Sequence, residues 1–91
     1  MVKRVILDCE KLLRRRQAHL YLAEIMEFPD YYGKNLDALY DCLTELDECT
    51  IVLEGEDILN NSESYGTKIL KVLKEAANSN QALKLEVQDA V

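Results

Sequence analysis

The stretch DYYGKNLDALYDCLT, residues 30–44, predicts a glycine-containing loop that leads into an amphipathic helix. Leucine recurs at positions 36, 39, 43 and 46, and spacings of three and four residues are typical of a buried helix face. Asn35 can cap this helix, because its side-chain oxygen can accept from backbone N–H groups two or three residues on. At about 100° per residue the opposite face is mostly acidic and carries Asp37, Asp41, Thr44, Glu45 and Glu48.

The acids of this predicted helix are poorly placed for folding alone. Asp37 suits the first turn, where the helix dipole stabilises a negative charge. Asp41 follows four residues later, and like charges at that spacing destabilise a helix by roughly 0.2–0.5 kcal/mol. Aspartate is also a poor helix former in mid-helix, and Glu45 repeats the repulsion. A helix selected only for stability would carry a lysine here, so the acids either serve a partner or only keep the domain soluble.

The run from Tyr31 to Thr44 closely resembles the barstar family of intracellular ribonuclease inhibitors. The resemblance is specific in this loop and helix. It extends to residues 50–54 and 69–76, where only the pattern of residue types is similar. The chain departs from the family at three positions. Lys34 stands where the best-known inhibitor has an acid, and Tyr40 and Leu46 replace tryptophans.

The resemblance implies an inhibitor that plugs the active site of a basic, guanyl-specific microbial ribonuclease of the extracellular type. Asp41 would be the principal mimic of an RNA phosphate, with Asp37 beside it, because carboxylates accept charge-assisted hydrogen bonds from the enzyme's cations. The remaining contacts implied are Tyr31, Gly33 and Asn35 from the loop, Tyr40 and Thr44 from the helix, and Glu75 from a later helix. Glu75 has a second interpretation, since Lys71 lies four residues before it and could form an ordinary surface ion pair.

The tyrosines allow two interpretations from the residues alone. Tyr31, Tyr32 and Tyr40 could offer a partner rigid contact area with a polar tip. Alternatively, Tyr32 and Tyr40 could pack against the edge of the core, with the acids serving only solubility. Gly33 would permit either close backbone approach or a positive φ. The alternative function is a barstar-fold interaction module that binds a basic protein other than a nuclease.

The rest of the chain predicts three strands separated by helical segments. Residues 2–7 and 50–54 are rich in β-branched and aliphatic side chains, and residues 83–87 alternate as a half-exposed strand does. Strands joined by helices favour parallel pairing with right-handed crossovers. We therefore expect an α/β fold with a three-stranded parallel sheet packed with helices, in one domain that spans residues 1–91.

Two further helices follow from the apolar pattern. Residues 17–27 look helical, and Pro29 would end that helix because the residue before a proline avoids helical geometry. A second helix should begin after Tyr65 and Gly66, preceded by a crossover at residues 55–64 with at most a short helix. The inward face of this second helix would hold Ile69, Leu70, Val72, Leu73, Ala76 and Ala77.

Composition and charge exclude several classes of protein. No apolar run approaches the ~20 residues of a membrane span, and three cysteines without paired spacing indicate reduced thiols in a cytoplasm. The net charge is −6, and residues 30–48 hold six acids against one base, which repels nucleic acid and favours a cationic partner. The Arg14-Arg15-Arg16 triplet lacks interleaved aromatics, so we interpret it as a solvated helix start. We expect a cytoplasmic protein that is monomeric when free and binds neither nucleic acid nor membrane.

The sequence offers little support for an enzyme or a metal centre. His19 is the only histidine, and without a neighbouring acid on its helix we interpret it as a surface or boundary residue. Asp37 and Asp41 could hold magnesium or act as an acid–base pair, but no phosphate loop or second acidic cluster accompanies them. His19 and the three cysteines are not spaced as zinc ligands. We predict a non-catalytic protein without a cofactor.

Overall fold

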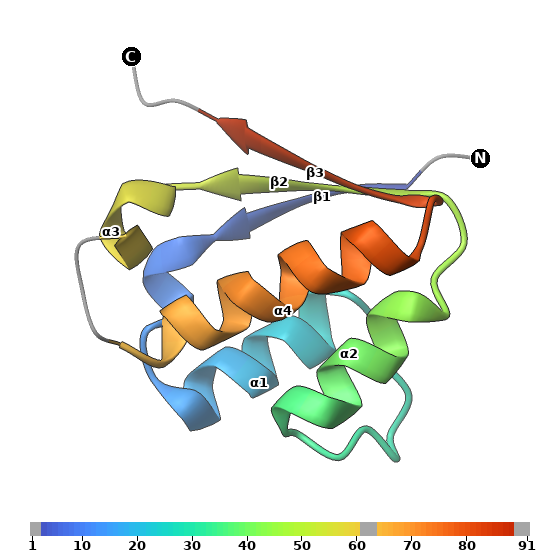
Figure 1. The fold of residues 1–91 in the computed structure, drawn as a ribbon. Helices are drawn as coiled ribbons and strands as arrows, with labels where there is room; N and C mark the ends of the chain where they lie inside the picture. Colours follow the sequence, from blue (N-terminus) through green and yellow to red (C-terminus); the bar gives the residue numbers. More distant parts are fainter. Residues whose placement is uncertain (1–2, 61–63, 89–91) are drawn as a thin grey trace.

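Three parallel strands form a sheet in the order β1-β2-β3, with β2 in the centre (Figure 1). The strands are β1 (Lys3–Asp8), β2 (Cys49–Glu54) and β3 (Leu83–Gln88). The structure, a computed structural model, describes residues 3–60 and 64–88. Val2 and residues 61–63, which we assigned to the first strand and to the crossover, lie outside these ranges. The predicted α/β class and the parallel sheet are confirmed.

The central strand is buried along almost its whole length, because the sheet is shielded on both faces. Helices cover one face. On the other face, the Arg4 side chain from β1 reaches across β2 to Glu86 on β3, with Nη1 and Oε2 3.3 Å apart. Thr50 and Val52 of β2, paired in register with these two residues, are 8% and 2% exposed. The burial of this continuous apolar run therefore has a physical explanation.

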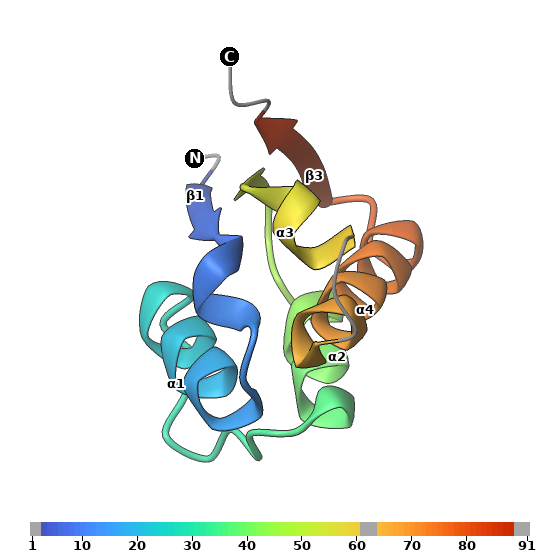
Figure 2. The ribbon, with the colours of Figure 1, turned by 90° about the vertical axis from the view of Figure 1, so that its left-hand side faces the viewer.

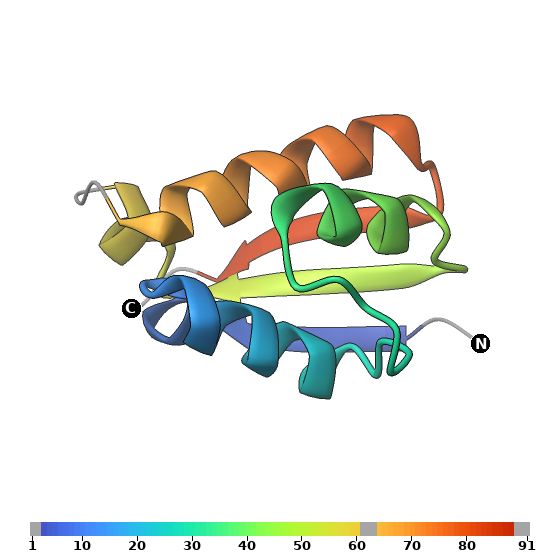
Figure 3. The same cartoon turned by 90° about the horizontal axis from the view of Figure 1, so that it is seen from below.

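The helices connect the strands on one side of the sheet (Figures 1 and 3). A 3-10 turn, η1, and the helices α1 to α4 are described, spanning Cys9–Leu12, Arg15–Ile25, Leu36–Thr44, Glu56–Asn60 and Tyr65–Ser79. In Figure 3, α1 lies along β1, while α2 and α4 lie side by side over the other half of the sheet. Among the described residues, no helix combines the length and apolar character that crossing a membrane requires.

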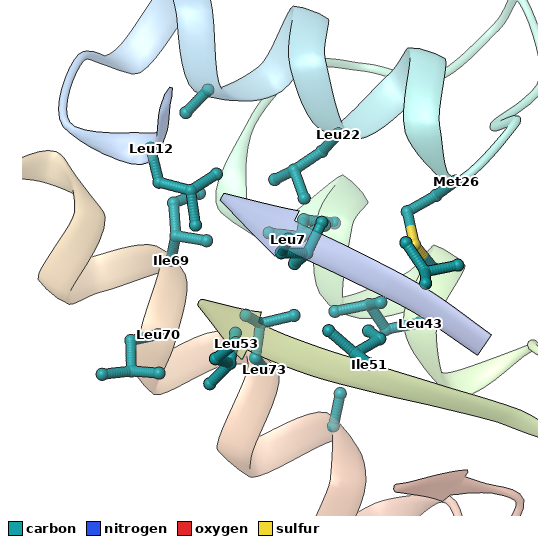
Figure 4. Packing of buried hydrophobic residues seen from close by; sticks show 14 of the residues in the cluster. Leu7, Leu12, Leu22, Met26, Leu43, Ile51, Leu53, Ile69, Leu70 and Leu73 are labelled. Carbon is teal, nitrogen blue, oxygen red and sulfur yellow. The ribbon is translucent and has the colours of Figure 1, made fainter. Parts of the chain in front are cut away.

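The core lies between the sheet and these helices (Figure 4). Leu7 and Ile51 project from the sheet toward Leu22 of α1 and Leu43 of α2, and all four are fully buried. Ile69 and Leu73 of α4 are buried against the same cluster, as the spacing in that helix predicted. Truncating one such side chain to alanine typically costs about 2–5 kcal/mol, so this cluster holds the layers together.

The end of α1 differs from the prediction. The helix stops at Ile25 rather than Glu27, four residues before Pro29. Glu27 has a φ of 56°, and the Phe28 N–H donates to the Ala23 carbonyl at 3.0 Å, which is a Schellman-type helix end. A left-handed residue therefore ends the helix, and the proline only follows in the loop.

Candidate partner-binding site

The start of α2 is capped by Asn35, as predicted. Its side-chain oxygen accepts from the Ala38 N–H at 2.8 Å, and its side-chain amide donates to the Gly33 carbonyl at 3.3 Å. The same side chain thus ties the first turn of α2 to the loop before it. Asp37 is exposed in that first turn, where the helix dipole stabilises its charge.

Gly33 has no positive φ, but its neighbours leave little room for a side chain. The left-handed residue of this loop is Lys34, with a φ of 54°, and Gly33 is not among the positive-φ glycines. A Cβ at Gly33 would lie 3.3 Å from both the Ala38 Cβ and the Asn35 Nδ2, closer than most side chains tolerate. Of our two expectations for Gly33, close approach is therefore the one that holds.

The two faces of α2 are separated as the periodicity predicted. Leu39 and Leu43 are fully buried and Leu36 is half-buried, while Asp37 and Asp41 are exposed. The helix ends at Thr44, whose hydroxyl donates to the Asp41 carbonyl at 3.0 Å. Leu46 and Glu48 consequently lie beyond the helix, and the acidic helical face is shorter than the prediction.

A hollow of about 480 Å³ between α2 and α4 brings four of the eight predicted site residues together. This acidic hollow is lined by Leu36, Asp37, Tyr40, Asp41, Val72 and Glu75. Asp37, Asp41 and Glu75 are exposed, and within residues 3–60 and 64–88 none has a basic nitrogen within 4.0 Å. The suggested ion pair between Lys71 and Glu75 is therefore absent from that part of the chain. Three uncompensated carboxylates at one site can accept hydrogen bonds from a cationic partner.

Two polar contacts hold α2 against α4 at this site. The hydroxyl groups of Tyr40 and Ser79 share a hydrogen bond of 2.8 Å, so Tyr40 spans the two helices beside the acids. The Asn80 amide donates to the carbonyls of Leu43 and Leu46, both at 3.0 Å, and so caps the end of α2. The residue pattern around Asn80 does not predict this role. Its partners lie more than thirty residues away, so local sequence contains no signal for this contact.

The structure contradicts our interpretation of His19 as a surface or boundary residue. His19 is 1% exposed, and its Nδ1 and Nε2 each lie 2.7 Å from a hydroxyl, that of Tyr32 and that of Tyr65 respectively. Burial, and secondarily the positive charge of Arg15, hold the pKa of His19 below its usual 6.5. Its place on α1 three residues before the buried Leu22 is the signal that could have indicated this burial.

The tyrosines of the loop divide between the core and the solvent. Tyr32 is 5% exposed and packs on Phe28 with ring centroids 4.8 Å apart, whereas Tyr31 is 86% exposed. Burial raises the pKa of the Tyr32 hydroxyl, which therefore stays protonated. His19 thus holds Tyr32 in the core through its hydrogen bond, and the neighbouring Tyr31 points into solvent.

The described residues contain no group of three or more His, Cys, Asp and Glu side chains that could hold a metal ion. Cys9, Cys42 and Cys49 are free thiols, and burial raises the pKa of Cys9 to about 11. A protonated, buried thiol is a poor nucleophile and a poor metal ligand.

Comparison with known proteins identifies the family. The family model described as Barstar (barnase inhibitor) matches residues 2–89. The chain belongs to the barstar family. It is also similar to the Bacillus subtilis (strain 168) protein named "Putative ribonuclease inhibitor YrdF", with 37% identity over 78 residues that cover 82% of this chain and 86% of that protein. Barstar-family proteins are inhibitors rather than enzymes, and the three-stranded parallel sheet packed with helices is consistent with the barstar fold.

Proposed function

We propose that this barstar-family protein inhibits a basic ribonuclease by inserting α2 and the loop before it into the enzyme's active site. Membership of the barstar family and the printed name of the Bacillus subtilis relative support a ribonuclease as the partner. The single observation that carries the proposal is the acidic hollow, where Asp37, Asp41 and Glu75 stand exposed without a cation from the described residues.

The chemistry of a ribonuclease cleft fits these acids. Such a cleft holds RNA phosphates with cationic side chains, and a carboxylate satisfies the same donors through short, charge-assisted hydrogen bonds. Asp41 lines the hollow with Asp37 of its own helix and Glu75 of α4, and by the family resemblance it takes the role of the principal phosphate. The clustered negative charge also accelerates the encounter with a basic enzyme, and added salt slows that encounter.

The remaining site residues surround these three acids. Tyr31 offers an exposed aromatic ring on one side, and Tyr40 and Thr44 flank the acids along α2. Gly33 and Asn35 are exposed on the capped loop, where they contact the enzyme and hold the loop in place. The partner is a guanyl-specific enzyme of the extracellular type. The inhibitor acts as a monomer in the cytoplasm, where it protects the cell's own RNA from that enzyme.

The test is inhibition of a panel of small basic guanyl-specific ribonucleases at low and at moderate salt. Wild-type protein should inhibit at least one of them, more strongly at low salt. Asp41→Ala should weaken that inhibition by about 2–5 kcal/mol, the usual cost of truncating one partner of a buried charge pair. Glu54→Ala is the matched control, since Glu54 is exposed at the far end of β2, outside the acidic hollow, and its loss changes the net charge equally.

Three results would contradict the proposal. Equal effects of Asp41→Ala and Glu54→Ala would show that only net charge matters and that the acidic hollow is not the contact. Binding to a ribonuclease without inhibition would favour the alternative, an interaction module for a basic protein. Turnover of RNA by the protein itself, lost in Asp41→Ala, would make it an enzyme.

A further inference from the structure

A second charged surface, of opposite sign, lies next to the proposed binding loop. It contains five exposed cations, namely Lys11, Arg14, Arg15, Arg16 and Lys34. None of them forms an ion pair with a carboxylate of the described residues, although the Lys11 Nζ lies 5.1 Å from the centroid of the Tyr21 ring. Four of these cations come from η1 and the start of α1, and the fifth comes from the loop before α2.

The loop brings Lys34 onto this surface. In Figure 2 the starts of α1 and α2 lie at the same lower end of the molecule, and the loop that joins the helices runs beneath them. There a hollow of about 430 Å³, the basic hollow, is lined by Arg15, Arg16, His19, Leu20 and Lys34. A neighbouring hollow along α1 shares Arg16 and Leu20 with it and adds Lys11 and Arg14. The cations therefore surround Leu20, which is 44% exposed.

The basic hollow is continuous with the surface that we propose for ribonuclease binding. Lys34 lies between Gly33 and Asn35, and Tyr31 is exposed three residues before it. A partner that covers Tyr31 and Asn35 cannot avoid the Lys34 side chain. The backbone there has a φ of 54°, a conformation that glycine and asparagine adopt more readily than lysine.

We propose that the ribonuclease-binding surface is bipolar. The acidic hollow faces the enzyme's cationic cleft, and the basic hollow faces carboxylates on the rim of that cleft. This inference rests on the proposed function and specifies its partner further: the enzyme inhibited best carries acidic side chains beside its active site. A ribonuclease with cations at that rim would be repelled by Lys34 and Arg16, so the basic hollow sets specificity.

An acidic protein surface fits the basic hollow better than nucleic acid does. The apolar side chain among its cations is the half-exposed Leu20, and the aromatic ring that lines the hollow, that of His19, is buried and offers no surface on which a base could stack. A ring of charges around an apolar centre is typical of a protein–protein contact. The chain's net charge of −6 also opposes the approach of a polyanion.

The proposal is tested by whether one charge reversal strengthens or weakens inhibition. The variants are Lys34→Glu and, as the matched control, Lys84→Glu on the face of β3 away from the helices; its neighbours Leu83 and Leu85 pack toward the core. Both change the net charge by the same amount. If the enzyme's surface is basic throughout, Lys34→Glu should tighten inhibition more than Lys84→Glu, because position 34 lies closer to the enzyme. A bipolar interface predicts the opposite, a weakening of fivefold or more for Lys34→Glu and a change below threefold for Lys84→Glu.

The enzyme for this measurement is the basic guanyl-specific ribonuclease that the wild-type protein inhibits most strongly. Arg16→Glu should weaken its inhibition as Lys34→Glu does, because both side chains line the basic hollow. Tighter inhibition by Lys34→Glu, with loss in Asp41→Ala, would overturn the bipolar surface and leave the proposed function intact. Absence of inhibition by the wild type would overturn both. Binding of a short single-stranded RNA that Lys34→Glu abolishes, without loss of inhibition, would assign the hollow to nucleic acid and also overturn the proposal.

Discussion

Removing the Tyr32 hydroxyl should destabilise the fold substantially, although the change deletes a single oxygen atom. In Tyr32→Phe, the His19 Nδ1 loses its partner at 2.7 Å while it stays buried among side chains. The loss is costly in either tautomer, because an unpaired ring nitrogen remains whether it accepted from Tyr32 or donated to it. An unsatisfied buried polar group costs about 1–3 kcal/mol. For a domain of this size each kcal/mol lowers Tm by about 4–8 °C.

The assay is urea unfolding at pH 7.5, with Tyr31→Phe as the control. The neighbouring tyrosine is 86% exposed and forms no hydrogen bond through its hydroxyl with the described residues, so the same chemical change should cost less than about 0.5 kcal/mol. A loss below about 0.5 kcal/mol for Tyr32→Phe as well would refute the anchoring role of His19. Losses of about 1 kcal/mol or more in both variants would instead show that Tyr31 is buried and would invalidate the description of the loop.

Three further predictions concern single residues. The free energy of unfolding should fall as the pH drops below about 6.5. Burial lowers the pKa of His19, so below that pH the native state binds fewer protons than the unfolded chain. This pH dependence, measured by urea unfolding, should disappear in His19→Gln. Asp41→Ala should raise the Tm slightly in a calorimeter, by the equivalent of about 0.2–0.5 kcal/mol for each like-charge pair relieved, and unfolding of this variant would instead make Asp41 structural. Asn80→Ala should cost about 1–3 kcal/mol in urea because the carbonyls of Leu43 and Leu46 each lose a side-chain donor and the Ala82 N–H loses its acceptor, and Asn78→Ala, an exposed neighbour, should cost little.

Periodicity predicts the elements of this fold well because their apolar residues follow the spacing of a helix or a strand. Leu39 and Leu43 of α2 and the continuous run of β2 are buried as their spacing indicated, whereas the alternation of β3 places Leu83 in the core and leaves Val87 exposed. The end of α1 escaped prediction because a left-handed glutamate, Glu27, ends it, and glutamate gives no composition signal for that conformation. Pro29, which follows in the loop, was a misleading signal for the end of the helix.

The site is harder to predict than the fold, because its parts meet only through tertiary packing. Asp37 and Asp41 share a helix face, and sequence spacing alone places them together. Glu75 reaches the same hollow only because α4 packs along α2, and its nomination came from the family resemblance rather than from any local pattern. The partners of His19 are 13 and 46 residues away, so no window of sequence contains the contact that buries it.

The arrangement explains how the fold tolerates an acidic helix that its own charges weaken. The repulsion along α2 amounts to a few tenths of a kcal/mol for each pair, whereas one buried leucine on its other face contributes about 2–5 kcal/mol. Polar contacts at three points also hold the site in place: Asn35 at the start of α2, Asn80 near its end, and His19 against Tyr32 of the loop. Because these anchors all lie outside the acidic face, the surface acids can vary with the partner while the backbone that presents them stays unchanged. Lys34 and the arginines of α1 would then also be surface residues that can vary with the partner, on a surface next to the acidic face.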